Sequence, residues 1–125
     1  MNKPRCVLIV DDDPHVRGML SESLRAEGYT VTTAENGWVG LNVLDSGEVD
    51  VVILDLLMPK MTGWDFLERR YTHPFGSDVP VVVVSGSLAD VVIPELERLG
   101  VYAYFAKPFD LPELLKCIGG IVRGT

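Results

Sequence analysis

Four of the short apolar runs in this chain are each followed by polar side chains that could take part in chemistry. They are Asp11 and Asp12 after the first run, Asp55 after the third, Ser85 after the fourth and Lys107 after the fifth. If the runs are parallel strands, their carboxyl ends meet at one edge of a sheet, where open α/β folds bind ligands. Three carboxylates within about 5 Å repel by about 3 kcal/mol per pair at an effective dielectric near 20. The cluster therefore needs a cation or raised pKa values.

A hard divalent cation is the simplest partner for such carboxylates, and Mg²⁺ suits carboxylate, carbonyl and water oxygens. A carboxylate nucleophile, a metal ion and a fixed positive charge are also the parts that phosphoryl transfer requires. Asp55 is the candidate nucleophile, Ser85 offers a hydroxyl for a phosphoryl oxygen, and Lys107 could pair with that group.

Each of these residues also has a simpler interpretation when it is taken alone. Asp11, Asp12 and Asp55 could each cap a following turn or helix, although Asp13 already fills that role for the first helix. Ser85 could be a turn residue and Lys107 a solvated charge. The placement of all of them after strand-like runs favours the chemical interpretation.

The elements that would position these residues alternate between short apolar runs and helical patterns, which is typical of a parallel sheet covered by helices. The third run ends at Asp55 and is followed by Pro59, which a central strand does not accept. The expected strands are Arg5–Val10, Thr30–Ala34, Val51–Leu54, Val81–Val84 and Tyr102–Phe105.

Helix signals separate the expected strands. Asp13-Pro14 predicts a cap and first turn for a helix that ends at Gly28. Pro94 interrupts the fourth helix, so that helix either bends or begins late, with Asp90 as a candidate cap. The expected helices are 14–28, 37–44, 63–71, 88–99 and 111–120, and Gly119-Gly120 is expected to fray the last one.

Composition indicates a single domain over residues 1–125. Hydrophobic residues make up 47% of the chain, and 18 acidic against 11 basic residues give a net charge of −7. The basic residues are scattered, which argues against direct nucleic-acid binding. Cys6 and Cys117 follow no metal-binding spacing, and no apolar run is long enough to cross a membrane. We expect a soluble, cytoplasmic protein.

Four motifs together resemble the receiver domain of bacterial two-component response regulators. They are Val10-Asp11-Asp12-Asp13-Pro14, Leu54-Asp55-Leu56-Leu57-Met58-Pro59, Val84-Ser85-Gly86 and Ala106-Lys107-Pro108-Phe109. No one of these motifs is decisive, but their order and spacing match the family over nearly the whole chain. The resemblance implies a flavodoxin-like α/β sandwich of five parallel strands in the order 2-1-3-4-5.

The resemblance also implies roles for individual residues. Asp55 would accept a phosphoryl group from a sensor histidine kinase or a histidine phosphotransfer protein, and Mg²⁺ would be held by Asp11, Asp12, Asp55 and the backbone carbonyl of Leu57. Lys107 would contact the phosphoryl group, Ser85 would be the switch hydroxyl, and Tyr104 the aromatic residue that reorients with it. Pro108 would follow a cis peptide bond.

The implied output face contains the fourth helix, the fifth strand and the fifth helix, at Asp90–Leu99, Tyr102–Phe105 and Leu111–Ile118. It would bind an output partner or effector domain, and could support a phosphorylation-dependent homodimer. The chain would be a signalling domain rather than an enzyme with its own substrate.

Three positions depart from the usual receiver pattern. Thr62 stands where receivers often have Asp; because this is an expected turn, we predict an effect on stability alone. Leu57 cannot orient an attacking water through its side chain, although Ser87 could, which predicts a moderately long-lived phosphoryl group. Pro94 alters the helix that contributes to the output face.

Two other functions compete with phosphorylation-dependent signalling. A haloacid dehalogenase-type hydrolase also uses an Asp at a strand end. That family requires a second Asp two residues after the first, and Leu57 occupies this position here. A degenerate receiver that acts only as a docking module would not need Asp55, the metal-binding acids and Lys107, all of which are intact.

Overall fold

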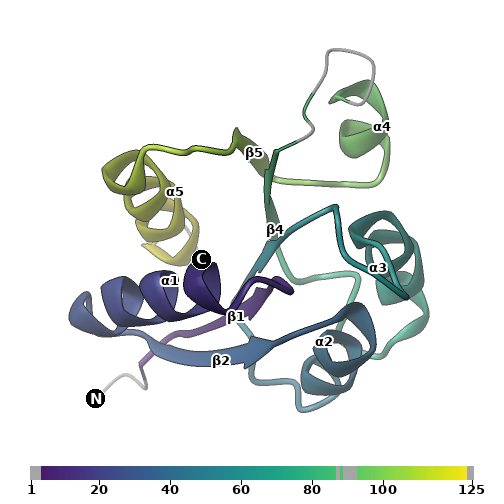
Figure 1. The fold of residues 1–125 in the computed structure, drawn as a ribbon. Coiled ribbons are helices and arrows are strands. Elements are labelled where there is room, and N and C mark those ends of the chain that lie inside the picture. Colours follow the sequence, from purple (N-terminus) through teal and green to yellow (C-terminus); the bar gives the residue numbers. More distant parts are fainter. Residues whose placement is uncertain (1–3, 87, 89–92, 124–125) are drawn as a thin grey trace.

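A computed structural model describes residues 4–86, 88 and 93–123 of the chain. Strands and helices alternate along it, as Figure 1 shows. In chain order the elements are β1 (Cys6–Val10), α1 (Pro14–Ala26), β2 (Thr30–Ala34), α2 (Gly37–Leu44), β3 (Val51–Leu54), α3 (Gly63–Arg69), a 3₁₀ turn (Arg70–Thr72), β4 (Val81–Ser85), α4 (Ile93–Arg98), β5 (Ala103–Ala106) and α5 (Leu111–Arg123).

The five strands form one parallel sheet in the order β2-β1-β3-β4-β5. This confirms the predicted flavodoxin-like α/β sandwich. The register pairs Val10 of β1 with Ala34 of β2 and with Leu54 of β3. These strands therefore end at the same level, and the residues that follow β1 and β3 meet at one edge of the sheet.

Helices cover both faces of the sheet, with α1 and α5 on one side and α2, α3 and α4 on the other (Figure 1). Alternate residues of β1 face opposite layers: Val7 and Ile9 pack with Leu20 of α1, whereas Leu8 and Val10 pack in the other cluster. All four residues of β3 are buried, as expected for a central parallel strand. Within the described residues, no helix is both long and apolar enough to cross a membrane.

The first helix begins as the sequence predicts. The Asp13 side chain accepts a hydrogen bond from the His15 backbone N–H at 2.9 Å, and Pro14 occupies the first helical position. This cap satisfies a free N–H group of the first turn. Helix α1 therefore starts only three residues after Asp11, which fixes the turn between them.

Several predicted boundaries are wrong by one or two residues. Strand β1 begins at Cys6 rather than Arg5, β4 includes Ser85, and β5 is Ala103–Ala106 rather than Tyr102–Phe105. The shift of β5 follows from its pairing, because Ala106 lies opposite Ser85 at the end of β4. The ends of β4 and β5, which carry Ser85 and lead into Lys107, therefore remain adjacent.

The last two helices bear on the predictions made for Pro94 and for the Gly119-Gly120 pair. The described part of α4 begins at Ile93, which places Pro94 in its first turn; the candidate cap Asp90 lies outside the described residues. Helix α5 continues through Gly119 and Gly120 to Arg123 instead of ending there. Ile118, Gly119 and Ile121 are buried, and packing against the sheet outweighs the poor helix propensity of glycine.

Candidate functional site

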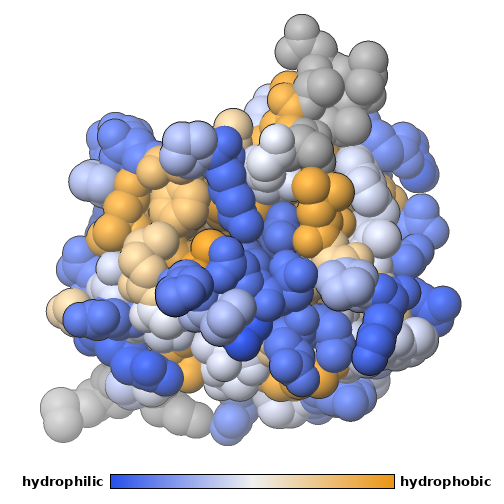
Figure 2. Space-filling view, viewed as in Figure 1, coloured by the Kyte–Doolittle hydropathy of each residue, from blue (hydrophilic) through white to orange (hydrophobic). Residues whose placement is uncertain are grey.

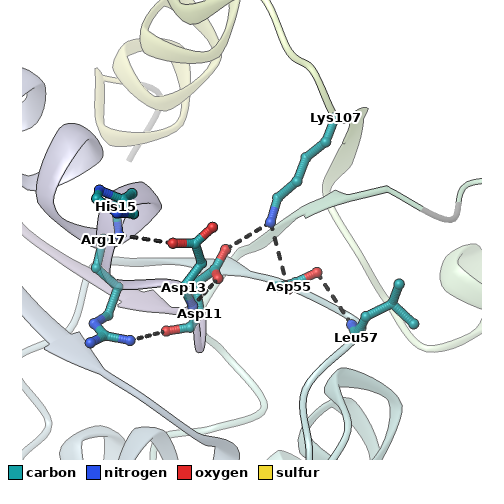
Figure 3. A network of polar contacts seen from close by, with 7 residues as sticks. All are labelled: Asp11, Asp13, His15, Arg17, Asp55, Leu57 and Lys107. Atoms are coloured by element: carbon teal, nitrogen blue, oxygen red, sulfur yellow. Dashed lines mark hydrogen bonds and ion pairs between the residues drawn. The ribbon is translucent and has the colours of Figure 1, made fainter.

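The carboxylate of Asp11 lies at the end of β1 and is held on both oxygens. It is 3% exposed. Oδ1 accepts a hydrogen bond from the Asp13 backbone N–H at 2.9 Å, and Oδ2 accepts one from the ammonium of Lys107 at 3.1 Å (Figure 3). The Asp11 backbone N–H donates to the carbonyl of Ala34 in β2. Asp11 is thus a fixed acceptor, oriented by two strands and the following turn.

Asp55 lies beside Asp11, at the end of β3. Its backbone N–H donates to the Val10 carbonyl at 3.0 Å, which extends the β1–β3 pairing to the site. Its Oδ1 accepts a hydrogen bond from the Leu57 backbone N–H at 3.2 Å. The residue is only 5% exposed, whereas the Leu57 side chain is 57% exposed beside it. Asp55 is therefore buried but sits close to the surface.

Helix α3 begins directly against the backbone of Asp55. The Gly63 N–H donates to the Leu56 carbonyl at 3.0 Å, and a Cβ on Gly63 would lie 2.4 Å from the Asp55 carbonyl oxygen. Only glycine allows this approach without a shift. Thr62 caps α3 by accepting from the Asp65 backbone N–H, while the Asp65 carboxylate accepts from the Thr62 N–H. Thr62 is therefore a helix cap rather than a simple turn residue.

The third acid completes a compact cluster of oxygen ligands. One carboxylate oxygen from each of Asp11, Asp12 and Asp55 lies within 4.8 Å of the other two. Asp11 and Asp55 are buried, and Asp12 is exposed. Figure 2, in the same view as Figure 1, shows hydrophilic residues over the middle of this face, where β1 ends. The all-carboxylate donor set, open on one side, fits a hard divalent cation such as Mg²⁺.

Lys107 supplies a positive charge to the same cluster. Its Nζ lies 3.1 Å from Asp11 Oδ2 and 3.6 Å from Asp55 Oδ2. Burial lowers the pKa of Lys107, but the hydrogen bond that its ammonium donates to Asp11 and the negative charges of Asp11 and Asp55 outweigh this effect, so its pKa lies above the usual value. Lys107 is therefore protonated at neutral pH and bridges two of the three acids.

Asp55 has a raised pKa, mainly because it is buried. The Leu57 N–H and the charge of Lys107 lower that pKa, whereas the charges of Asp11 and Asp12 raise it. Burial and repulsion prevail over these favourable contacts. A further cation among the three acids would oppose both effects and favour the ionised form.

Residues 7–119 match the family model described as the response regulator receiver domain. The match covers most of the chain and includes every residue of the cluster. The chain belongs to this family. This match confirms the predicted family resemblance. Receiver domains are signalling modules of two-component systems.

Similar proteins include two regulators that are longer than this chain. The transcriptional regulatory protein GlrR of Escherichia coli K12 is 40% identical over 118 residues, which are 94% of this chain and 26% of that protein. The response regulator MprA of Mycolicibacterium vanbaalenii is 36% identical over 98% of this chain and 52% of that protein. The receiver therefore spans between a quarter and about half the length of these curated relatives.

Solved structures similar to this receiver include chemotaxis protein CheY4 of Vibrio cholerae, with 30% identity and a TM-score of 0.86 over 95% of this chain and 99% of that one. A putative response regulator from Chloroflexus aurantiacus has 31% identity and a TM-score of 0.87, over 97% and 99% of the two chains. The fold and the family thus agree.

The receiver's remaining predicted residues lie near the cluster to different degrees. Ser85 is fully buried at the end of β4, and its carbonyl accepts the Lys107 backbone N–H at 2.9 Å. The Lys107–Pro108 peptide is cis, as predicted. Tyr104 is 41% exposed on β5 and is not among the contacts of the acidic cluster. Ser87 lies outside the described residues.

Sequence reasoning missed one residue that contacts the site. Arg17 on α1 donates from Nη1 to the backbone carbonyl of Asp11 at 2.7 Å (Figure 3). Long side chains on a helix point toward its N-terminus. An Arg at the fourth position of a helix that starts just after Asp11 could therefore have been predicted to contact this turn.

Proposed function

We propose that this receiver is a phosphorylation switch in which Asp55 accepts the phosphoryl group. One observation supports this above all others: the oxygens of Asp11, Asp12 and Asp55 lie within 4.8 Å of one another, with the Lys107 ammonium 3.6 Å from Asp55. A carboxylate nucleophile with a metal-binding acid pair and a fixed cation is the set that phosphoryl transfer uses.

The transfer would proceed by direct displacement at phosphorus. An Asp55 carboxylate oxygen attacks the phosphorus of a phosphohistidine, forming a P–O bond as the P–N bond breaks. The imidazole nitrogen keeps the electron pair of the broken bond and then takes up a proton. Leu57 N–H and Lys107 hold Asp55 in place before the reaction. Lys107 can then pair with an oxygen of the transferred group.

Asp11, Asp12, Asp55 and the Leu57 carbonyl are the proposed Mg²⁺ ligands. The metal would neutralise negative charge that develops on the phosphoryl oxygens. Asp11 brings a carboxylate already oriented by Lys107 and the Asp13 N–H. Asp12 adds an exposed carboxylate at the open side of the cluster.

The proposed output is a change in the α4–β5–α5 face. The new phosphoryl group adds negative charge and acceptor oxygens beside β4, and Ser85 at the end of that strand is the proposed hydroxyl donor. Tyr104, exposed on β5, would reorient as Ser85 moves. Two such packings of one segment would let phosphorylation control an output partner, an effector domain or a homodimer.

The phosphoryl donor is proposed to be a sensor histidine kinase or a histidine phosphotransfer protein. The relatives named above are a transcriptional regulatory protein and a response regulator. An effector that controls transcription is therefore the proposed kind of downstream partner.

Incubation with MgCl₂ and acetyl phosphate tests the acceptor directly. We expect one phosphoryl adduct by intact-mass spectrometry, located at Asp55, with slow release afterwards. Asp55→Asn should remove the adduct, whereas Asp13→Asn should retain it because Asn also caps helices. Continuous phosphate release would indicate a hydrolase instead, and no adduct at all would indicate a docking module.

A further inference from the structure

The peptide bond between Asp11 and Asp12 is held from helix α1. The guanidinium of Arg17 donates from Nη1 to the Asp11 carbonyl oxygen, which belongs to that peptide, at 2.7 Å (Figure 3). Arg17 is itself fixed in the first part of α1, where its backbone N–H donates to the Asp13 carbonyl at 3.0 Å. The contact therefore ties the turn after β1 to a rigid element.

This tie matters more for Asp12 than for Asp11. The Asp11 carboxylate is already oriented by the Asp13 N–H and by Lys107. Asp12 is exposed, and its side chain has no hydrogen bond to any of the residues that the structure describes. Its carboxylate is therefore directed mainly by its backbone, which begins at the peptide that Arg17 holds.

Arg17 holds the backbone of the site in place and does not act as a counterion to its carboxylates. Its bond is to a carbonyl oxygen, and the charges that act on the pKa of Asp55 are those of Asp11, Lys107 and Asp12. Lys107 neutralises charge on the acids, because it makes the two ion pairs with them that occur among the described residues. The two basic residues thus have separable effects.

We propose that Arg17 is a positioning residue for the divalent cation site, because it fixes the Asp11–Asp12 peptide so that the Asp12 carboxylate points into the cluster. This inference rests on the proposed function, in which Asp11, Asp12 and Asp55 hold Mg²⁺. Groups that orient metal ligands typically change metal affinity by about 10- to 100-fold. Since Arg17 acts through the backbone, the lower end of that range is expected.

Arg25 provides a matched control on the same helix. It also donates to a backbone carbonyl, that of Val31 at 3.3 Å, but away from the acidic cluster. Arg17→Met and Arg25→Met each remove one positive charge and one such bond. Lower positive charge by itself should tighten binding of a cation. The two variants should therefore change Mg²⁺ affinity in opposite directions or by clearly different amounts.

Calorimetric titration of the unphosphorylated protein with MgCl₂ measures this without relying on phosphorylation. We expect the Kd of Arg17→Met to rise about 10-fold, with Arg25→Met at or slightly below wild type. Arg17→Lys should recover part of the loss, because an ammonium can still donate to the carbonyl. Circular dichroism at the titration temperature confirms that each variant is folded.

A double-mutant cycle with Asp12→Asn tests whether Arg17 affects Mg²⁺ binding through the Asp12 carboxylate. If Arg17 acts through Asp12, its loss should matter by less than about twofold once the Asp12 carboxylate is gone. Equal Mg²⁺ affinity of Arg17→Met and Arg25→Met, or an undiminished effect of Arg17→Met in the Asp12→Asn background, would overturn the inference. No saturable Mg²⁺ binding by wild type would instead reject the proposed metal site, and the inference with it.

Discussion

The Lys107 ammonium lies 3.6 Å from Oδ2 of Asp55. Burial of this carboxylate raises its pKa. Among the described residues, the charge of Lys107 and the Leu57 N–H oppose this rise, whereas the charges of Asp11 and Asp12 add to it. The pKa of Asp55 therefore depends on opposing effects of burial and of the Lys107 charge. Removing that charge should change both the ionisation of Asp55 and its ability to react.

Lys107→Met should raise the pKa of Asp55 further and slow its phosphorylation. The variant removes the nearest positive charge and the proposed donor to the phosphoryl group. Loss of one such donor typically slows a reaction by about 100-fold or more. Carbon-13 NMR titration of the Asp side chains measures the pKa, and mass spectrometry with acetyl phosphate measures the rate. Lys116→Met, on the exposed side of α5, is the matched control and should change neither.

The raised pKa of Asp55 also predicts how stability depends on pH. In the unfolded chain Asp55 has the ordinary aspartate pKa of 3.8, which lies below its pKa in the folded protein. As pH rises through the interval between these two values, the unfolded state loses its proton first, so stability falls. Asp55→Asn, which keeps the shape and cannot ionise, should therefore be more stable than wild type at neutral pH without metal.

Urea denaturation at several pH values checks this. The difference between Asp55→Asn and wild type should shrink as pH falls toward 3.8, because both side chains are then neutral. Millimolar MgCl₂ should stabilise wild type more than the variant, since ligand that binds only the folded state adds stability. A variant less stable than wild type at neutral pH would show that the contacts to Lys107 outweigh burial.

The sequence predicts the placement of the site well because that placement depends on local patterns. The apolar run before Asp55 is a buried parallel strand, and Asp13-Pro14 starts α1 as expected. Since parallel strands end at one edge, Asp11, Asp55 and Lys107 had to converge there. The carboxylate oxygens of the three acids lie within 4.8 Å of one another because of how the strands pair. Local sequence patterns imply that pairing only indirectly.

Contacts between distant segments were not predictable in the same way. Arg69 and Arg70 both look like exposed residues at a helix end, yet Arg69 is exposed and Arg70 is 1% exposed. The difference arises because Arg70 donates hydrogen bonds to backbone carbonyls up to 30 positions away in the chain, in addition to the neighbouring Tyr71 hydroxyl. Nothing in the periodicity of the helix distinguishes the two arginines.

Leu57→Asn should shorten the lifetime of the phosphoryl group. Leu57 is two residues after Asp55, its side chain is 57% exposed, and it cannot hold a water molecule by hydrogen bonds. An amide there can orient an attacking water, and we expect about 10-fold faster dephosphorylation, below the 10²–10⁴ of a full general base. Loss of the adduct is followed by mass spectrometry after acetyl phosphate is removed. Leu57→Met is the apolar control, and an unchanged rate in Leu57→Asn would contradict the idea.

Arg70→Met should destabilise the fold by about 2–4 kcal/mol, because several buried carbonyls would lose their donor. Nη1 donates to the Gly76 carbonyl at 2.8 Å and Nη2 to the Leu99 carbonyl at 3.1 Å, which joins the segments before β4 and β5. Burial lowers the pKa of this guanidinium, and no carboxylate of the described residues forms an ion pair with it. It contributes to the fold through these hydrogen bonds and through its contact with the Tyr71 ring, whose centroid lies 4.4 Å from its guanidinium carbon.

Arg69→Met is the matched control for that measurement. Arg69 is the adjacent residue and carries the same charge, but its guanidinium lies over the exposed Trp38 ring at 4.9 Å. Such a contact at an exposed site contributes about 0.5–1 kcal/mol. Urea denaturation should therefore separate the two variants by at least about 1 kcal/mol. Equal midpoints and slopes would mean that relief of the buried charge in Arg70→Met offsets the lost hydrogen bonds, as happens when some buried ion pairs are replaced by apolar residues.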